Sequence, residues 1–535
     1  MLKKKYLWLV LGLIVLYLVT HIFHLTALPV FADEAIYIRW SQLIMDDWSR
    51  YLFFPLNDGK TPLFVWLMVP FLQVWQDPLF AGRLVSVITG LVQVWLMASI
   101  TYQLTNKRSS ALMAGLLTSF LPFWFFHQRM ALMDGLLAVW LSLALLASIK
   151  VSQMIAWQAA GWRLIKWQIA LAVGLGLGFW TKLPAVLALP MLFLTPWLVG
   201  TKSKINVHPI ATKKRAGLAL INQVAHSWCL NYFKIYFVKL FWPVLAGLVF
   251  FLTLKFQPAF SQLFGRGGDF LYGLDEFLAG GWWSSIRQWP KYALVIWQYL
   301  TPMIALLPLA GLATKRARTH FWLILMALSY ALPIMFLGKV VYARYLLPMA
   351  IPLTLSASIG LGDFLHRVQR QKELKRRLLW SLVAVLVVAN LMGPVTQNLY
   401  YAWFDTDHLP LVAGDKVQYL NEWSSGHGIK ETTQLILAQA KTSRVAVATE
   451  GYFGTLPDGI LMYLHNRDVL NIKVEGIGQP VREIPSEFLD SANEFDQVWL
   501  VVNSHRNFLK LDPSQLLAQY CRPDPAICLE VWRLR

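Results

Sequence analysis

The sequence is poor in charged residues and in cysteine. Only 14% of its 535 residues are charged, whereas soluble domains average about 25%. Three cysteines are too few for a disulfide-rich secreted scaffold. Apolar residues make up 57% of the chain and include 25 Trp and 31 Phe. Such a chain cannot cover several soluble cores with polar surface, so the composition predicts a polytopic α-helical membrane protein.

Eleven apolar runs come near the length that crosses a bilayer, about 17–25 residues, although a few are shorter. They are residues 6–28, 84–104, 109–126, 135–149, 168–181, 184–199, 240–256, 291–311, 319–337, 345–361 and 378–396. We therefore expect about 11 transmembrane helices. The first run follows three lysines, as in a signal peptide, but it continues to Leu28 without a convincing cleavage site. It therefore reads as an uncleaved first span.

Acidic residues are scarce on one side of these spans. The segments on that side hold 24 of the 48 basic residues, and their only acids are Asp363 and Glu373. Cytoplasmic segments carry such a basic excess, so the N-terminus is predicted to be cytoplasmic and the C-terminus extracytoplasmic, in a cell (inner) membrane. The net charge of +19 is then a topology signal. It gives no reason to expect a nucleic-acid partner.

The last outer segment, residues 399–535, has a different pattern from the preceding residues 1–398. Strand-like runs at 444–449, 469–474, 497–502 and 528–533 alternate with helical runs at 409–423, 429–441, 460–465 and 514–520. This alternation predicts a small extracytoplasmic α/β domain. Cys521 and Cys528 lie in this segment, where disulfides persist. They either close a short loop or stay free.

Two adjacent acids, Asp33 and Glu34, open the first outer loop, residues 29–83. Ionisable groups beside lipid are costly and often functional. The alternative is a helix start, with Asp33 as N-cap and Glu34 in the first turn. Ile36, Trp40 and Ile44 follow at helical spacing. They predict an amphipathic helix in the membrane interface that holds the acids at headgroup depth, facing water.

Cations and further acids from other segments reach the same outer surface. The cations are Lys60, Arg83, Arg129, Lys182, Lys339 and Arg344. Each binds a lipid phosphate or only extends to ordinary headgroups. Asp134 opens a span as a helix N-cap, a second active-site acid or a metal ligand, and His127 is the nearby metal-type nitrogen. The convergence of these cations and acids on the outer surface favours a functional role, because the positive-inside rule draws cations to the cytoplasmic side.

The order of these motifs resembles a known family. The motifs are Asp33-Glu34-Ala-x-Tyr37, Lys60-x-Pro62-Leu63, Arg83-Leu-x-Ser86, Arg129-x-Ala-x-x-Asp134, Thr181-Lys182 and Arg344-Tyr345-x-x-Pro348. Together they are similar to the GT-C membrane glycosyltransferases, in the bacterial branch of protein O-mannosyltransferases and lipid A aminoarabinose transferases. The resemblance covers about residues 1–360. Thr61-Pro62 stands where the family usually has two prolines.

The resemblance implies an enzyme that takes a sugar from a polyprenyl phosphate carrier at the extracytoplasmic face. It transfers that hexose or pentose, usually with inversion, to a protein hydroxyl, a lipid or a glycan. Asp33 is then the general base or orients the acceptor. Glu34 and Asp134 assist it by holding the acceptor or a divalent metal, for which Glu34, His127 and Asp134 are the candidate ligands.

In the same interpretation, the cations bind the carrier phosphate. Lys60, Arg83, Arg129 and Arg344 are the first candidates to bind it, and Lys182 and Lys339 are secondary ones. The alternative function is a flippase or binding protein for lipid-linked sugars. A transporter places its polar groups near the middle of the membrane, whereas here they gather at one surface, which favours the enzyme.

Overall fold

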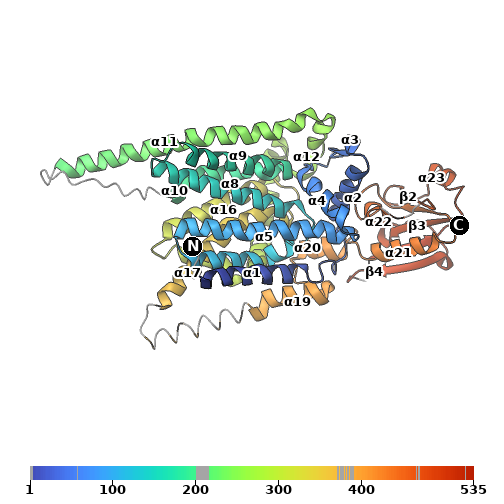
Figure 1. Ribbon diagram of the computed structural model, residues 1–535. Coiled ribbons are helices and arrows are strands. Elements are labelled where there is room, and N and C mark those ends of the chain that lie inside the picture. The colour runs from blue at the N-terminus through green and yellow to red at the C-terminus, as the bar shows by residue number, and fades with distance from the viewer. Residues whose placement is uncertain are drawn as a thin grey trace.

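The computed structural model describes the chain except residues 1–3, 57, 200–215, 466, 468–469, 525 and most positions between 370 and 390. Long helices lie side by side in a bundle, and a sheet domain carries the C-terminus at one end of it (Figure 1). The N-terminus lies toward the other end. Between the bundle and the sheet lie α2 (Ala32–Asp46), α3 (Trp48–Tyr51) and α4 (Leu63–Val74). The short helix α20 (Ala413–Lys416) joins them there.

The bundle is formed by the apolar runs of the sequence. Its helices are α1 (Lys4–Ile22), α5 (Pro78–Thr105), α6 (Arg108–Phe120), α7 (Pro122–His127), α8 (Met133–Ala156), α9 (Trp162–Thr181), α10 (Leu189–Val199), α11 (Ala216–Leu252), α15 (Pro302–Gly311), α16 (Ala317–Leu337) and α17 (Ala350–Gln369). Within the described residues, six helices are long and apolar enough to cross a membrane, or up to seven with one bent pair. These lengths agree with a multi-pass membrane protein.

Six predicted runs coincide with these six helices: 84–104, 135–149, 168–181, 240–256, 319–337 and 345–361. The runs 6–28 and 184–199 become the shorter apolar helices Tyr6–Ile22 and Leu183–Val199. The run 378–396 lies mostly outside the described residues. The prediction from hydropathy therefore locates spans even where proline lies inside them, as Pro243 does in α11 and Pro333 in α16.

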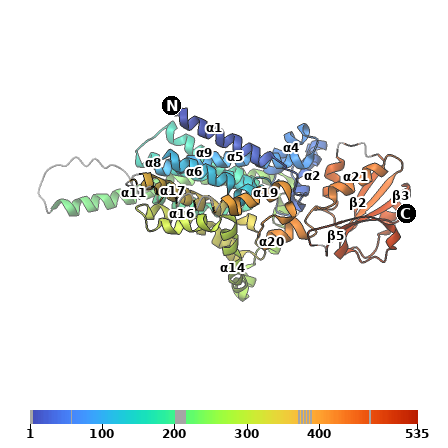
Figure 2. The ribbon, with the colours of Figure 1, turned by 90° about the horizontal axis from the view of Figure 1, so that it is seen from below.

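Two predicted runs are divided at proline. The run 109–126 becomes α6 and α7, which meet at Leu121 and Pro122. The run 291–311 becomes α14 (Trp282–Tyr299) and α15, bent by 102°. Thr301 precedes Pro302 with a positive φ of 61°, and the residue before a proline avoids the helical region. As a result α14 stands out from the bundle, as Figure 2 shows.

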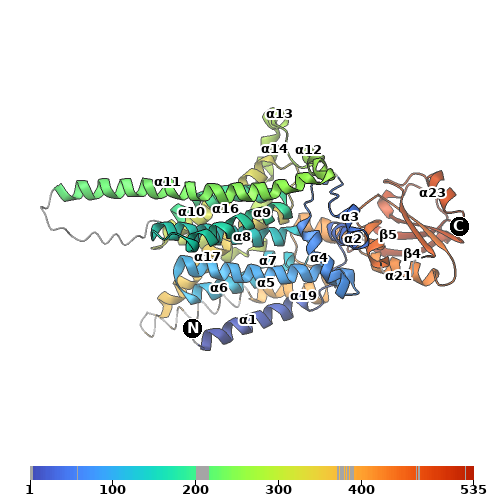
Figure 3. The same cartoon turned by 45° about the horizontal axis from the view of Figure 1, so that its top comes forward.

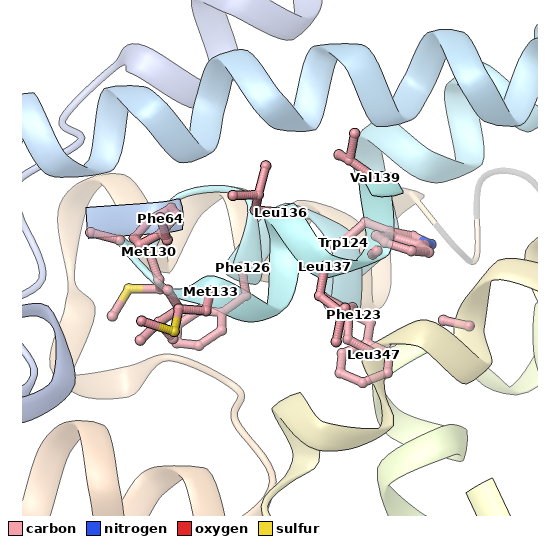
Figure 4. Close-up of a cluster of buried hydrophobic side chains, with 14 of the residues drawn as sticks. Phe64, Phe123, Trp124, Phe126, Met130, Met133, Leu136, Leu137, Val139 and Leu347 are labelled. Carbon is pink, nitrogen blue, oxygen red and sulfur yellow. The ribbon is translucent and has the colours of Figure 1, made fainter. Parts of the chain in front are cut away.

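Figure 3 shows how far α11 runs along the bundle and how α12 (Gly267–Phe270) and α13 (Leu274–Glu276) lie near α14. Inside the bundle, bulky side chains of α7 and α8 fill the core, among them Phe123, Trp124, Leu137 and Val139 (Figure 4). Helices α8 and α9 approach closely at Gly174. An added Cβ there would lie 3.0 Å from the Trp140 carbonyl oxygen, so a small residue is required at this crossing.

Helix α2 forms as predicted, but its apolar face does not lie on lipid. Ile36, Trp40 and Ile44 are buried, and α2 packs against α4 and against α22 (Asp458–Leu464) of the sheet domain. The expectation of an interfacial helix was therefore wrong in this respect. Its apolar stripe is covered by protein that lies more than 400 residues later in the chain, which periodicity alone does not reveal.

The C-terminal part is an α/β structure with one five-stranded sheet, in the order β2-β1-β3-β5-β4. The strands are β1 (Val445–Thr449), β2 (Ile472–Gly476), β3 (Gln497–Asn503), β4 (Leu516–Cys521) and β5 (Cys528–Arg533). Strands β1, β2 and β3 are parallel, and β5 and β4 join antiparallel. Helices α21 (Ile429–Gln439) and α22 contribute to the same core as alternate strand residues such as Val447, and α23 (Ser486–Ser491) covers the other face.

The predicted helix 514–520 was wrong, because Leu516–Cys521 is strand β4. Its Leu, Ala and Gln residues favour a helix. Pairing with β5 nevertheless makes this segment a strand, and the register places Cys521 opposite Cys528. The predicted helix 409–423 is shorter than expected: α20 is followed by one π-helical turn, Val417–Asn421. The helix α19 (Thr396–Phe404) precedes it.

Candidate active site

Asp33 lies in the first turn of α2, at the end of the bundle that faces the sheet domain. The helix N-cap is Phe31, so Asp33 is not the cap. Its carboxylate accepts a hydrogen bond from Arg344 at 2.9 Å and forms an ion pair with Lys60 at 3.6 Å. Burial raises the pKa of Asp33, but Lys60 and then Arg344 lower it to below its ordinary value. The carboxylate is therefore ionised at neutral pH.

Arg344 is held by two parts of the chain that are distant in sequence. It lies in the 3-10 turn Ala343–Met349, before α17. Its second guanidinium nitrogen donates to Gln418 Oε1 at 3.2 Å and to the Tyr419 hydroxyl at 3.3 Å. The ring centroids of Phe31 and Tyr342 lie 5.0 and 4.9 Å from the guanidinium carbon. This cage fixes the cation beside Asp33.

Lys60 approaches Asp33 from the loop between α3 and α4. Its ammonium group also pairs with Asp58 at 3.7 Å and lies 5.2 Å from the Tyr37 ring centroid. Burial lowers the pKa of Lys60, but the Asp33 carboxylate and its neighbours raise it well above the ordinary value. Asp58 pairs in turn with Arg266 at 3.1 Å. This pair ties the loop of Lys60 to the segment before α12.

Asp134 and Lys182 form a second pair next to this cluster. Asp134 lies in the first turn of α8, and its carboxylate accepts a hydrogen bond from Lys182 at 2.7 Å. The Lys182 ammonium lies 4.4 Å from the centroid of the Tyr345 ring, and Tyr345 follows Arg344 directly in the chain. The structure therefore brings four predicted residues and Asp33 into one neighbourhood.

Glu34 has a different environment from its neighbour Asp33. It is fully buried and forms a two-pronged ion pair with Arg83, at 2.8 and 2.7 Å. Its oxygens also accept the backbone N–H groups of Phe31 and Ala131, at 3.0 and 2.7 Å. Arg83 gives further hydrogen bonds to the carbonyl oxygens of Leu25, Leu28 and Pro29. This pair joins α2, α5, the end of the first span and the start of α8.

Arg129 closes the C-terminal end of α1. Its guanidinium donates to the carbonyl oxygens of Thr20, His21, Phe23 and His24 at 2.9–3.0 Å. The last carbonyls of a helix have no partner within the helix, and a basic side chain satisfies them well. In this structure both Arg83 and Arg129 therefore direct their donors to the protein scaffold.

The three candidate metal ligands do not come together. The oxygens of Glu34 are occupied by Arg83 and by two backbone amides, and Asp134 pairs with Lys182. The ring of His127 is buried, and its Nδ1 donates to the Phe123 carbonyl oxygen at 2.8 Å. Within the part of the chain that the structure describes, no group of three or more His, Cys, Asp or Glu side chains is arranged to hold a metal ion. These residues, as placed, do not fit a divalent cation.

Two other predicted features lie away from Asp33. Lys339 donates to the Gly268 carbonyl oxygen and to Glu276, both at 2.8 Å, and so fastens the segment of α12 and α13. Cys521 and Cys528 form a disulfide across β4 and β5. Neither feature takes part in the cluster around Asp33.

Sequence reasoning missed Gln418 and Tyr419, which hold Arg344, and Asp415, which accepts a hydrogen bond from Tyr299. All three lie in the segment that begins at α20. Burial raises the pKa of Asp415 to about 6, despite the hydrogen bond from Tyr299. The only signal in the sequence was the prediction of a helix over 409–423 directly after the last span. It gives no indication that this helix returns to the bundle.

Residues 47–264 match the family model described as dolichyl-phosphate-mannose-protein mannosyltransferase. ArnT from Cupriavidus metallidurans, solved with bound undecaprenyl phosphate, is similar over 100% of this chain and 98% of its own, with a TM-score of 0.54 and 15% identity. The oligosaccharyltransferase of Archaeoglobus fulgidus in its apo form is similar over 94% of this chain and 70% of its own, with a TM-score of 0.52 and 10% identity. No curated protein matches the sequence.

At these identities the solved structures establish the fold, and the family model adds a sequence match over residues 47–264. The match with ArnT extends over the sheet domain as well as the bundle, because it covers the whole chain. The protein is thus a multi-pass membrane protein with the fold of ArnT, which is the GT-C type that its motifs predicted.

Proposed function

We propose that the protein is an integral membrane glycosyltransferase that moves a sugar from a polyprenyl phosphate carrier to an acceptor at the extracytoplasmic face. One observation carries the proposal: the Asp33 carboxylate is shared by Lys60 and Arg344 in a partly exposed cluster at the outer end of the bundle. The ArnT structure with the same fold holds undecaprenyl phosphate. A carboxylate and two cations suit the transfer of a sugar away from a phosphate.

The cations stabilise the leaving group. Negative charge grows on the carrier phosphate as its bond to the sugar breaks, and fixed cations lower the energy of that transition state. Lys60 and Arg344 are the cations beside Asp33. The Lys182 ammonium lies over the ring of Tyr345, the residue that follows Arg344. The same role for Arg83, Arg129 and Lys339 stays a prediction, and their contacts with the scaffold support a structural role instead.

Asp33 acts on the acceptor. As long as Lys60 and Arg344 pair with it, its lowered pKa makes it a weak base. A carrier phosphate that binds these two cations draws them away from the carboxylate, and the pKa of Asp33 then rises. Donor binding in this way activates the base that accepts the proton of the acceptor hydroxyl. Asp134 assists by positioning Lys182, and Glu34 assists by fixing the start of α2.

The finer assignments belong to the same proposal. The sugar is a hexose or a pentose, and direct displacement by the acceptor inverts its anomeric carbon. The acceptor is a protein hydroxyl, a lipid or a glycan. The basic segments place the N-terminus in the cytoplasm, with the Asp33 cluster and residues 399–535 outside the cell (inner) membrane. Residues 1–398 then form the membrane enzyme and 399–535 the outer domain.

A flippase or binding protein for lipid-linked sugars is the alternative function. Transport requires a site near the middle of the membrane that opens to both sides. The cluster of Asp33, Lys60 and Arg344 instead lies where α2 meets the sheet domain side of the bundle. This position favours catalysis at one surface.

The test is turnover of the donor. The purified protein in lipid nanodiscs would receive a panel of polyprenyl phosphate sugars together with membrane extract, and mass spectrometry would follow the release of free polyprenyl phosphate. We expect release from one class of donor sugar. Transfer of an intact lipid-linked sugar across a liposome membrane, without any release, would overturn the proposal in favour of a flippase.

A further inference from the structure

A polar cavity of about 310 Å³ lies between the bundle and the sheet domain, apart from the Asp33 cluster. Its walls come from α2, from the turn between α4 and α5, and from the end of α22. The polar and aromatic side chains of its lining include Gln42, Gln73, Trp75, Gln76, Tyr463, His465 and Arg467. The volume is at the lower end of the range for small-ligand sites, about 300–1,000 Å³.

One wall of the cavity carries an unpaired acceptor. Gln42 is 3% exposed, and its Nε2 donates to the Met462 carbonyl oxygen at 2.9 Å. Its Oε1 is buried and has no hydrogen-bond partner among the described residues. Buried polar atoms are nearly always paired, and among the buried side-chain atoms of the lining this acceptor is the one left unpaired.

His465, another residue of the lining, is held by a hydrogen bond with Asp46. His465 Nε2 lies 2.9 Å from an Asp46 oxygen, so the last residue of α2 fixes the end of α22. Gln42 and Asp46 lie one turn apart on α2, and both contact this part of the sheet domain. The cavity therefore lies where the two domains contact each other through side-chain hydrogen bonds.

The lining chemistry is that of a site for a saccharide. Side-chain amides offer both donors and acceptors, as sugar hydroxyl groups require, and Gln42, Gln73 and Gln76 supply three of them. Trp75 and Tyr463 add aromatic rings with a polar tip. A phosphate site needs several converging cations, whereas Arg467 is the one permanent cation in the lining.

We propose that this cavity binds a saccharide unit of the acceptor. The inference rests on the proposed transferase function and names one part of its second substrate. Gln42 follows Asp33 by nine residues on the same helix, which is about 13 Å along its axis. A saccharide unit bound at Gln42 therefore lies farther along the acceptor than the hydroxyl that reacts at Asp33. Because α2 is one continuous helix, it fixes the distance between these two positions. The acceptor is then a glycan or a glycolipid with sugar residues on the far side of its reacting group.

The first experiment measures acceptor kinetics. The double variant Gln73→Ala/Arg467→Ala removes two exposed side chains of the lining, so folding should be preserved. At saturating donor we expect its KM for acceptor in membrane extract to rise about tenfold, with kcat and the KM for donor unchanged. The matched control is Arg482→Ala/Gln519→Ala, two exposed residues elsewhere on the sheet domain. An acceptor KM equal to that of the control would overturn the proposal.

The second experiment does not depend on turnover. Saturation-transfer NMR on the full chain in nanodiscs would use soluble disaccharides, with glycerol 3-phosphate as a mimic of a lipid headgroup. Binding of a disaccharide by the wild type and by the control, but not by the lining variant, supports the cavity even if no transfer is found. Binding of glycerol 3-phosphate alone, or of neither probe, would contradict it. The binding experiment can therefore fail while transfer is observed, and the reverse, so the two proposals are tested independently.

Discussion

Asp33 and Glu34 are adjacent on α2, yet the regions around them have opposite physical character. The Glu34 region is sealed: its carboxylate is fully buried, and Arg83 and two backbone amides occupy it. In the Asp33 region the carboxylate side chain is 17% exposed, and its two cations are Lys60 and Arg344. A saturated buried pair holds elements together, whereas partly exposed charges stay available for a ligand. A carboxylate is thus structural at Glu34, whereas at Asp33 it stays available for the chemistry that we propose.

The largest expected effect is on the sealed region. Glu34→Gln leaves the Arg83 cation buried without its partner, and breaking a buried ion pair in this way costs about 3–5 kcal/mol. We expect a large fall in melting temperature in nanodiscs and poor recovery of folded protein. A variant that melts like the wild type but has lost transfer would contradict the comparison and make Glu34 part of the chemistry.

A third carboxylate extends the comparison. Asp415 is buried like Glu34, but Tyr299 is its hydrogen-bond donor, and burial raises the pKa of Asp415 to about 6 from an ordinary value of 3.8. Since the folded state then binds the proton more tightly, the stability contribution is present below about pH 4 and is lost as pH rises through 6. The loss amounts to about 3 kcal/mol. We expect Asp415→Asn to flatten the change of melting temperature between pH 4 and 7. An unchanged slope would assign the effect to other groups.

The next effect is on the open region. Lys60→Ala removes one cation from the proposed phosphate site and leaves the scaffold of Glu34 and Arg83 in place. A charged hydrogen bond is worth about 1.5–3 kcal/mol, so the KM for the lipid-linked donor should rise about 10- to 100-fold. Initial rates over a series of donor concentrations measure this. An unchanged KM would remove Lys60 from the site.

The smallest effect is expected at Lys339, which gives a control cation outside the Asp33 cluster. Its partner Glu276 is exposed, and ion pairs with an exposed partner contribute little. Lys339→Ala should change the KM for donor by less than about twofold. A rise as large as that of Lys60→Ala would show that any outer cation serves, and the distinction between the two regions would then fail.

The sequence predicts the membrane fold well because hydropathy is a local property. Runs such as 84–104 and 135–149 coincide with full-length helices, and four of the five strands lie within about three residues of their predicted positions. The fifth, β4, was predicted as a helix because its local preference conflicts with pairing to β5. The break at Thr301 and Pro302 needed attention to one proline within an apolar run.

The site was predictable in part. Residue type and side of the membrane brought Asp33, Lys60, Asp134, Lys182 and Arg344 into one list, and the structure brings them into one neighbourhood. Sequence could not separate Asp33 from Glu34, because burial depends on which elements pack around α2. It also could not show that Gln418 and Tyr419 return to hold Arg344, since Gln418 follows Arg344 by 74 residues.

The most direct test of the central claim is the single substitution Asp33→Asn. We expect this substitution to lower the release of polyprenyl phosphate from the lipid-linked donor by about 100- to 10,000-fold, the contribution of a general base. The melting temperature should stay near that of the wild type, because the sealed pair of Glu34 and Arg83 is untouched. Release at the wild-type rate by a folded Asp33→Asn protein would contradict the claim that Asp33 carries the chemistry.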